Sequence, residues 1–212
     1  MDLINRLLDI TSSDILNGLP SFDIPEVESL KNNIELNGWH NRETTLQHTA
    51  IVFENFLKIV SKETNLRNYL KVKVGLCSKY DLLKLVVIFH DIAKPEVVVL
   101  KNAETSFLGH EEFSATKANA ILCRFSEVNS IDRQYILYII KNHGNVHKFL
   151  DTKRKGEKSF HQFIKQFQDF SIEMALIGYA DILRSYLEVS NNIDYRYRIA
   201  FFEDVIIFLF II

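Results

Sequence analysis

The chain has 212 residues, of which 47% are hydrophobic and 25% charged, the composition of an ordinary globular domain. Seven glycines and three prolines are few for this length, which disfavours both a disordered chain and a sandwich or barrel with many tight turns. The net charge of −2 supplies no overall field that would attract nucleic acid or a membrane. Because seven histidines stand against two cysteines, a bound metal is expected to have imidazole and carboxylate ligands rather than thiolates.

Hydrophobic residues recur with helical periodicity along almost the whole chain. Helices are predicted over residues 2–9, 25–36, 44–62, 80–93, 111–125, 131–142, 159–168, 171–188 and 193–210. The only plausible strand is Val97–Leu100, within a loop. We therefore predict an all-α, single-domain globule of about eight to ten helices. Its expected parts are an N-terminal helical appendage at 1–38, a core at 39–190 and a C-terminal helix at 191–212.

The N-terminus, the cysteines and the most apolar segment bear on where the protein works. No basic segment precedes an apolar run at the N-terminus, so we expect no signal peptide. Cys77 and Cys123 stand among hydrophobic residues and are expected to be core residues in a reducing compartment. The stretch VIIFLFII at 205–212 is too short for a bilayer, which takes about 20 residues. We therefore predict a cytoplasmic protein that does not enter the membrane.

The same stretch, 205–212, is expected to be a final helix packed into the core. A chain that ends in bare isoleucines lacks the polar cap that most helices carry. Two alternatives therefore stay open, namely a truncation after Ile212 and burial of the apolar tail in a homo-oligomer.

His90 and Asp91 are charged residues at the end of a very apolar segment, YDLLKLVVIFHDIA at 80–93. Such a pair is costly after a hydrophobic run unless something pairs it, and a metal cation is the simplest partner. Lys94 follows His90 by four residues and is expected on the same helix face. It is not a ligand itself, but it suits a phosphate oxygen that also contacts the metal. The alternative is a salt bridge at the helix end.

Two further polar residues are expected to point inward from separate helices. His48 is followed on its side of the predicted helix 44–62 by apolar residues, and Asp181 shares a stripe with apolar residues of the helix 171–188. Inward polar residues on separate helices are what a buried metal site needs. The alternatives are a core histidine at position 48 and an ion pair of Asp181 with Arg184 or another base.

The ends of two more predicted helices carry metal-ligand types. His110 and Glu111 open one helix, and His143 ends another before Gly144. His143 and His147 have the spacing of a zincin, but Gly144 stands where a zincin has its catalytic glutamate, so we discount that interpretation. The remaining histidines are expected to be surface or loop residues: His40, His147 and His161.

Taken in order, these residues resemble the HD superfamily of metal-dependent phosphohydrolases. The strings that carry the resemblance are LQHT at 46–49, FHDIAK at 89–94, GHE at 109–111, NHG at 142–144 and ADILR at 180–184. They span about residues 39–187, nearly the whole chain apart from its ends. The resemblance is closest to the HD module of bacterial tRNA nucleotidyltransferases, although the motifs of their catalytic head are not visible here.

The resemblance implies a metal-ligand set. The ligands of the first divalent metal would be His48, His90, Asp91 and Asp181. In members with two metals, His110 and His143 bind the second ion and Asp91 bridges both. Imidazole and carboxylate ligands do not choose among Mn, Fe, Co, Ni, Zn and Mg. The expected cofactor is therefore one or two divalent ions of unassigned identity.

The resemblance also implies catalytic roles. Asp91 and Lys94 would act at the reacting phosphate, which Lys94 would contact, and Glu111 would orient water or accept a proton. In relatives with one metal, His110 and His143 contact the substrate instead. A metal-bound water that loses a proton near neutral pH is the nucleophile that such sites supply.

We therefore predict a divalent-metal-dependent phosphohydrolase whose substrate is a small phosphate ester, best a nucleotide, either a monoester or a cyclic or diester phosphate. An RNA end is a further candidate, because three consecutive basic residues in the polar loop 153–158 (KRKGEK) would guide it. The alternatives are a non-catalytic HD-fold module that binds a ligand or a partner, and an iron-dependent oxygenase on the same scaffold. All motif residues are present, which favours catalysis.

Overall fold

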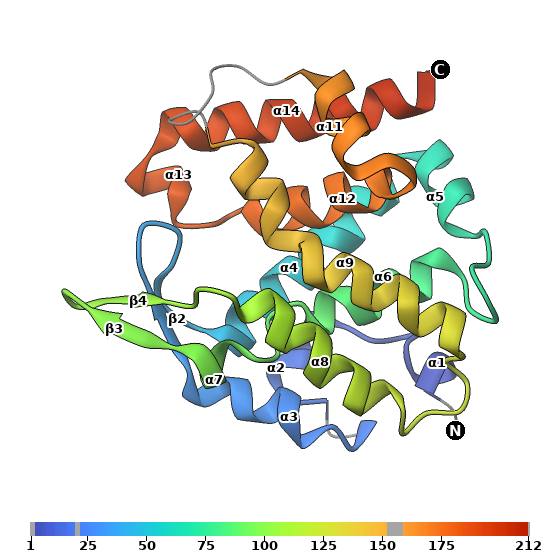
Figure 1. Cartoon of the computed structure of the whole chain (residues 1–212), viewed down its shortest axis with the longest axis horizontal. Coiled ribbons are helices and arrows are strands. Elements are labelled where there is room, and N and C mark those ends of the chain that lie inside the picture. The colour runs from blue at the N-terminus through green and yellow to red at the C-terminus, as the bar shows by residue number, and fades with distance from the viewer. Residues whose placement is uncertain (1–2, 20–21, 152–158, 212) are drawn as a thin grey trace.

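The computed structural model describes residues 3–19, 22–151 and 159–211, and most of them are helical (Figure 1). The helices of seven or more residues are α4 (Thr45–Lys62), α5 (Thr64–Leu70), α6 (Lys79–Phe89), α8 (His110–Leu122), α9 (Ser130–Phe149), α11 (Phe160–Phe167), α12 (Ser171–Ile182) and α14 (Asn192–Ile211). The shorter ones are α1 (Leu3–Arg6), α2 (Ser12–Leu16), α3 (Pro25–Glu28), α7 (Lys94–Val97) and α13 (Leu187–Ser190), with 3-10 turns at Ser29–Asn32 and Gln168–Phe170. The expected all-α globule is confirmed.

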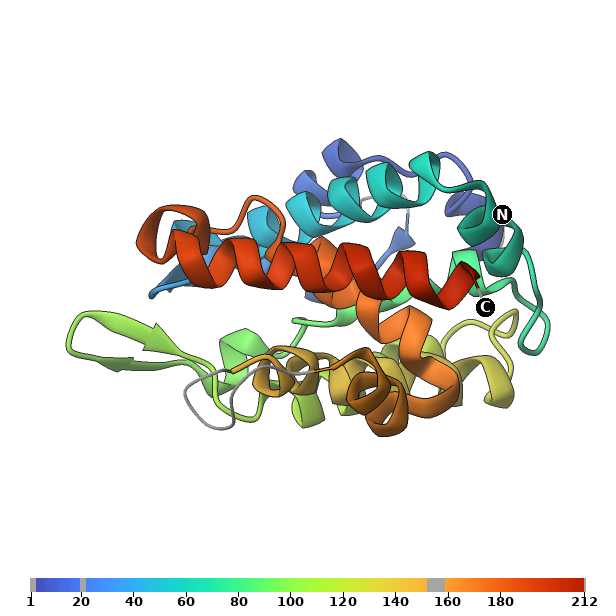
Figure 2. The same cartoon turned by 90° about the horizontal axis from the view of Figure 1, so that it is seen from above.

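Helix α6 lies at the centre of the fold. All of its residues from Leu82 to Phe89 are buried, so this part of the helix has no solvent-facing side. Ser78 caps its N-terminus by accepting a hydrogen bond from the amide of Asp81. Helices α4, α8 and α9 pack around it, and α12 contacts α4, α9 and α14. Helix α14 runs along one edge of the molecule (Figure 1), and in the view from that edge the layer that holds α4 lies to one side of it and the layer that holds α8 and α9 to the other (Figure 2).

Two short antiparallel hairpins complete the fold. Strands β1 (Ile34–Leu36) and β2 (Asn41–Thr44) form the first, and β3 (Val99–Lys101) and β4 (Glu104–Ser106) form the second. The hairpins are joined where the amide of Leu36 donates to Thr105 Oγ1 at 2.7 Å. The second hairpin projects from the body of the protein (Figure 2). It contains only part of the strand expected at Val97–Leu100.

The expected helix from Pro25 to about 36 is wrong. Helix α3 ends at Glu28, a 3-10 turn follows, and the chain then enters β1. The reason is tertiary, because the extended backbone turns the side chain of Glu35 into the protein. There its carboxylate accepts hydrogen bonds from Thr45 Oγ1 at 2.6 Å and from Lys94 Nζ at 2.8 Å.

Two helix ends near the motif residues differ from expectation. Helix α6 ends at Phe89, so His90 and Asp91 lie in the following turn. Helix α9 continues through Gly144 to Phe149 instead of ending at His143. The side chain of Glu111 packs directly against Gly144, which leaves no room for a larger residue at this position of the helix unless that side chain moves. A Cβ at position 144 would clash with Glu111 Oε1.

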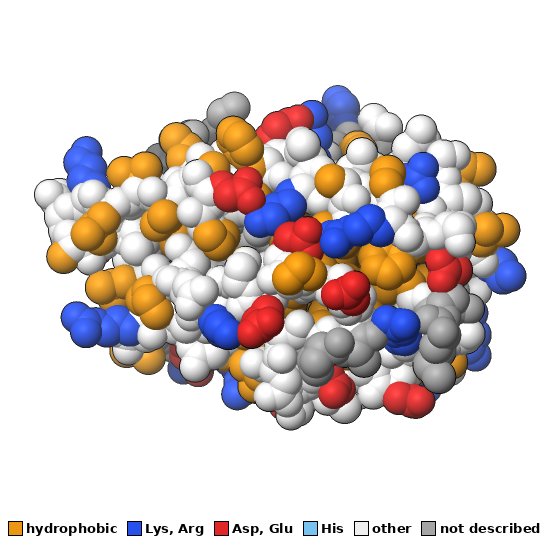
Figure 3. All heavy atoms as spheres, turned by 90° about the horizontal axis from the view of Figure 1, so that it is seen from below, with side chains coloured by type: hydrophobic (Ala, Val, Ile, Leu, Met, Phe, Trp, Pro, Cys, Tyr) orange, Lys and Arg blue, Asp and Glu red, His pale blue; other side chains and the backbone are white. Residues whose placement is uncertain are grey.

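Both ends of the described chain join the same hydrophobic core. Leu3 and Leu7 belong to it, as do Phe202 and Val205 of α14, so the final helix packs into the core as expected. Cys77 is buried, but the expectation of a core position for Cys123 is wrong, since this residue is exposed where α8 ends. Among the described residues, no helix combines the length and the apolar character needed to cross a bilayer. Acidic and basic side chains are interspersed on the face shown in Figure 3.

Candidate metal centre

The six residues implied as metal ligands come together around Asp91. They come from α4 (His48), from the turn after α6 (His90 and Asp91), from the start of α8 (His110), from α9 (His143) and from α12 (Asp181). Three of these donors, His48, His90 and Asp181, form one group, and Asp91, His110 and His143 form a second. Four helices and one turn that are distant in the chain therefore converge on one buried point.

The two carboxylate oxygens of Asp91 face different groups. Asp91 Oδ2 lies 3.0 Å from His90 Nε2 and 3.5 Å from His48 Nε2. Asp91 Oδ1 lies 2.9 Å from His110 Nε2 and 3.6 Å from His143 Nε2. The side chain is only 2% exposed. A carboxylate placed in this way can offer one oxygen to each of two ions.

Backbone carbonyls set the orientation of three imidazole rings. Because a carbonyl can only accept, the Nδ1 atom of each ring carries a proton and donates it, and Nε2 faces the centre. The acceptors are Val87 O for His90 at 2.7 Å, Phe107 O for His110 at 2.8 Å and Ile140 O for His143 at 2.6 Å. In each case the carbonyl belongs to the residue three positions earlier.

The donor set fits a divalent cation better than it fits internal hydrogen bonding. His90 Nε2 and Asp91 Oδ1 are buried, and neither makes a hydrogen bond of good geometry, although His110 Nε2 lies 2.9 Å from Asp91 Oδ1. His110 Nε2 and His143 Nε2 are 3.1 Å apart, and two neutral rings that are protonated at Nδ1 would direct their lone pairs at each other there. Buried acceptors without donors are costly. A cation that accepts lone pairs from nitrogen and oxygen would remove that cost.

The acidic residues of the centre are held ionised. Burial opposes the ionisation of Asp91, but nearby His90 and the Lys94 ammonium hold the pKa of its carboxyl well below the ordinary value. Burial likewise opposes the ionisation of Asp181, and its contacts with His147 and His48 hold its pKa well below the ordinary value. Both carboxylates are therefore available as ligands at neutral pH.

His48 is charged in the absence of a metal ion. Burial lowers its pKa, but the hydrogen bond and the charge of Asp181, whose Oδ1 lies 2.9 Å from His48 Nε2, raise the pKa to about 9. A metal ion at this nitrogen therefore has to displace a proton. The bases that pair with Asp181 are His48 and His147 and not Arg184, whose Nη1 binds Glu54 at 3.0 Å.

Lys94 lies at the centre, but on a different helix from the one expected. It starts α7 instead of following His90 on the same helix. Its buried Nζ lies 2.8 Å from Asp91 Oδ2 and 2.8 Å from Glu35 Oε2. Burial opposes the charge of Lys94, but these two carboxylates raise its pKa above the ordinary value. The amine is therefore a charged group clamped between two carboxylates.

Glu111 lies at the edge of the centre, in the first turn of α8. Its Oε2 is 3.7 Å from His110 Nδ1, and its Oε1 accepts from Lys148 Nζ at 3.0 Å. Burial opposes its ionisation, but hydrogen bonding to the backbone and the neighbouring His110 lower its pKa. It lines a pocket of 270 Å³ together with Trp39, Lys94 and His110.

Two histidines join the centre against expectation. His147 lies one helical turn after His143, and its Nε2 is 2.9 Å from Asp181 Oδ2. His40 is buried between β1 and β2, and its Nδ1 donates to Glu43 Oε1 at 2.7 Å. His161 is exposed, as expected.

The sequence contains a signal for the position of His147 but none for that of His40. The four-residue spacing of His143 and His147 was a usable signal once α9 is known to continue past Gly144. No local pattern marked His40, whose burial depends on the hairpin. The same holds for its partner Glu43 and for Glu35.

Trp39 also lines a second pocket. It has a volume of 720 Å³ and is lined by Trp39, His147, Tyr197 and Arg198, among others. The guanidinium of Arg198 lies 4.9 Å from the centre of the Trp39 ring. The basic loop 153–158, expected to guide an RNA end, lies outside the described residues.

Comparison with known proteins adds no family assignment. Neither a scan against models of protein families nor a search among curated proteins finds a match for this chain. The resemblance to the HD superfamily therefore stays a prediction that rests on the motifs.

Proposed function

We propose that this protein is a divalent-metal-dependent phosphohydrolase that acts on the phosphate ester of a nucleotide. The observation that carries the proposal is the placement of Asp91. Each of its oxygens faces two imidazole nitrogens, and three of the four rings have their tautomer set by a backbone carbonyl. A preorganised set of this kind is typical of a metal centre.

The chemistry follows from the residues beside the ligands. When bound, divalent ions lower the pKa of a coordinated water and offset charge on phosphoryl oxygens. Lys94 holds Asp91 from one side, and two of its three N–H donors are taken by Asp91 and Glu35. The third is available for a phosphoryl oxygen in the 270 Å³ pocket that Lys94 lines. Ionised Glu111, in the same pocket, would orient water or accept its proton.

The larger pocket supports an organic substrate group of nucleoside size. Its 720 Å³ volume is within the usual range for small-molecule sites. Trp39 lines both pockets, and we place the phosphate beside His110 and Lys94 and the organic group beside Trp39, Tyr197 and Arg198. This arrangement favours a phosphate ester with an aromatic or sugar-bearing leaving group over inorganic pyrophosphate.

The test combines metal analysis with a substrate panel. Purified protein is analysed for bound divalent ions and is then assayed with mononucleotides, cyclic nucleotides and a generic phosphodiester. We expect at least one bound ion and release of phosphate or ring opening with one of these classes. His90→Ala is expected to lose both metal and activity, whereas the matched control His161→Ala, at an exposed position, keeps both.

Three results would contradict the proposal. Full activity in His90→Ala would refute the site. Metal binding without turnover of any phosphate ester would indicate a binding module instead. Oxygen uptake with bound iron and without hydrolysis would indicate an oxygenase.

A further inference from the structure

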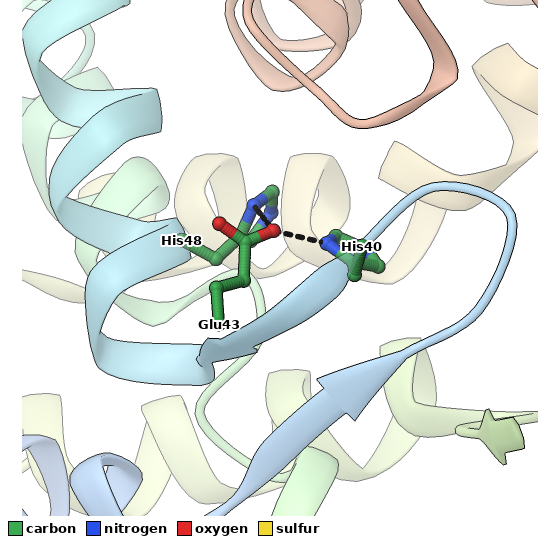
Figure 4. Close-up of side chains that lie close together, drawn as sticks. All are labelled: His40, Glu43 and His48. Atoms are coloured by element: carbon green, nitrogen blue, oxygen red, sulfur yellow. Dashed lines mark hydrogen bonds and ion pairs between the residues drawn. The ribbon is translucent and has the colours of Figure 1, made fainter. Parts of the chain in front are cut away.

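The ring of His48 is supported differently from the other rings of the centre. His90, His110 and His143 each donate Nδ1–H to a backbone carbonyl three residues earlier. The carbonyl three residues before His48 is that of Thr45, and it already accepts a hydrogen bond from Thr49 Oγ1 at 2.9 Å. The acidic group near His48 Nδ1 is the carboxylate of Glu43, whose Oε1 lies 3.9 Å away (Figure 4).

Glu43 is held in place from the other side. It lies in β2, directly before α4, and is half-buried. His40 Nδ1 donates to the same oxygen, Glu43 Oε1, at 2.7 Å, and His40 Nε2 is 3.2 Å from Glu35 Oε2. The rings of His40 and His48 pack edge to face with their centroids 4.7 Å apart. The carboxylate is therefore fixed beside His48, and a small movement brings it within hydrogen-bond distance.

His40, Glu43 and His48 also satisfy the distance requirement for a cation site of their own. Such a site would use His48 Nδ1, whereas the metal centre uses His48 Nε2. An imidazole that ligates through both nitrogens has to lose both protons, which a neutral or cationic ring does not do readily. A hydrogen-bonding role for Glu43 needs no such loss.

We propose that Glu43 is the outer carboxylate partner of His48. It accepts Nδ1–H when Nε2 binds a metal ion, and His40 positions it for this role. A carboxylate acceptor orients a ligating imidazole and raises its basicity more than a neutral carbonyl does. Glu43 and His40 are thus positioning residues that strengthen the site formed by His48, His90 and Asp181. The inference rests on the metal centre of the proposed function, but not on the reaction.

The experiment measures metal affinity without using turnover. Metal-free protein is titrated with Mn²⁺, and free Mn²⁺ is followed by electron paramagnetic resonance. Glu43→Gln is expected to weaken the ion at His48 by about 10–100-fold, while the ion at Asp91, His110 and His143 keeps its affinity. Glu43→Asp, which restores the charge, is expected to recover part of the loss. Repeating the titration in His110→Ala isolates the site at His48.

Two controls separate positioning from folding. Glu54→Gln makes the same substitution on α4, at a carboxylate that pairs with Lys58 and Arg184 away from the centre, and is expected to bind Mn²⁺ like the wild type. The melting temperature of metal-free Glu43→Gln is expected to match that of the wild type. His40→Gln, which loosens Glu43 without removing it, is expected to weaken the same ion by less than Glu43→Gln does.

Three outcomes would overturn the inference. Unchanged Mn²⁺ affinity in Glu43→Gln would remove any role for Glu43 in supporting His48. A wild type that binds three ions, with Glu43→Gln binding two at unchanged affinities, would make the His40 cluster a separate cation site. A wild type that binds no ion would contradict both the proposed function and this inference. The other two outcomes would contradict this inference alone.

Discussion

At the scale of single residues, each buried charge of the centre lies beside a group of opposite charge. Asp91 is surrounded by imidazoles and by Lys94, and Lys94 is neutralised in turn by Glu35, which is completely buried. A buried cation between two carboxylates is a structural element, whether or not it also contacts a substrate as we propose. Removing it leaves two carboxylates without their common partner.

Lys94→Met tests this structural part of its role. In metal-free protein we expect a loss of about 3–5 kcal/mol in the free energy of unfolding, because Glu35 and Asp91 stay buried without the cation. Urea unfolding in the presence of a chelator measures the loss. Lys58→Met is the control, since Lys58 is 58% exposed in its pair with Glu54 and is expected to change stability by less than about 0.5 kcal/mol. Equal effects of the two variants would contradict the clamped arrangement.

At the scale of elements, two glycines show how helices approach the centre. Gly144 of α9 faces the flexible end of Glu111, whereas Gly178 of α12 faces packed side chains. A Cβ at position 178 would lie 2.5 Å from Val146 Cγ1 and 2.7 Å from Phe202 Cζ. The first contact can be relieved by moving one side chain, and the second cannot.

The two alanine variants are therefore expected to fail in different ways. Gly178→Ala is expected to lower the free energy of unfolding by about 1–3 kcal/mol through overpacking. Gly144→Ala is expected to stay within about 1 kcal/mol of the wild type, because alanine favours the helix, but to displace Glu111 and lower kcat on the phosphate ester. Urea unfolding and steady-state kinetics measure the two effects. A stable Gly144→Ala with unchanged kcat would exclude Glu111 from the reaction.

At the scale of the whole molecule, a second buried polar cluster ties four helices together away from the metal centre. Glu173 of α12 accepts from Tyr69 Oη of α5 at 2.6 Å, from Tyr135 Oη of α9 at 2.8 Å and from Lys79 of α6 at 2.8 Å. Burial and the Glu173 carboxylate raise the pKa of both tyrosines above their ordinary value of 10.0. The folded protein therefore keeps protons that the unfolded chain releases in alkali.

The sign of the pH dependence follows from proton binding. Above about pH 10 the folded state binds more protons than the unfolded state, so the stability from these tyrosines is present below pH 10 and is lost as the pH rises beyond it. Urea midpoints between pH 8 and pH 11 are expected to fall steeply in the wild type and less steeply in Tyr135→Phe. Tyr138→Phe, at a partly exposed position on the same helix, is the control and is expected to keep the wild-type slope.

Local pattern was enough to predict the helical class and the core helices. Segments such as 80–93 are so apolar that burial follows from composition, and the N-terminal ends of α4 and α8 follow from their own residues. The types of the centre's donors could also be predicted, because His48 and Asp181 stand at inward positions of their helices and His90 directly follows a very apolar helix. The prediction that they act as metal ligands still awaits a metal measurement.

Partners between segments were not readable from local pattern. Glu35, His40 and Glu43 belong to a hairpin where a helix was predicted in part, and their roles arise only when β1 and β2 bring them against His48 and Lys94. His147 depends on α9 continuing past Gly144. Periodicity reports which side of an element is apolar, whereas the pairing of buried charges depends on which elements pack together. The tertiary structure decides that pairing, because packing alone determines which oppositely charged or hydrogen-bonding group lies beside a buried charge and offsets the free energy of burying it.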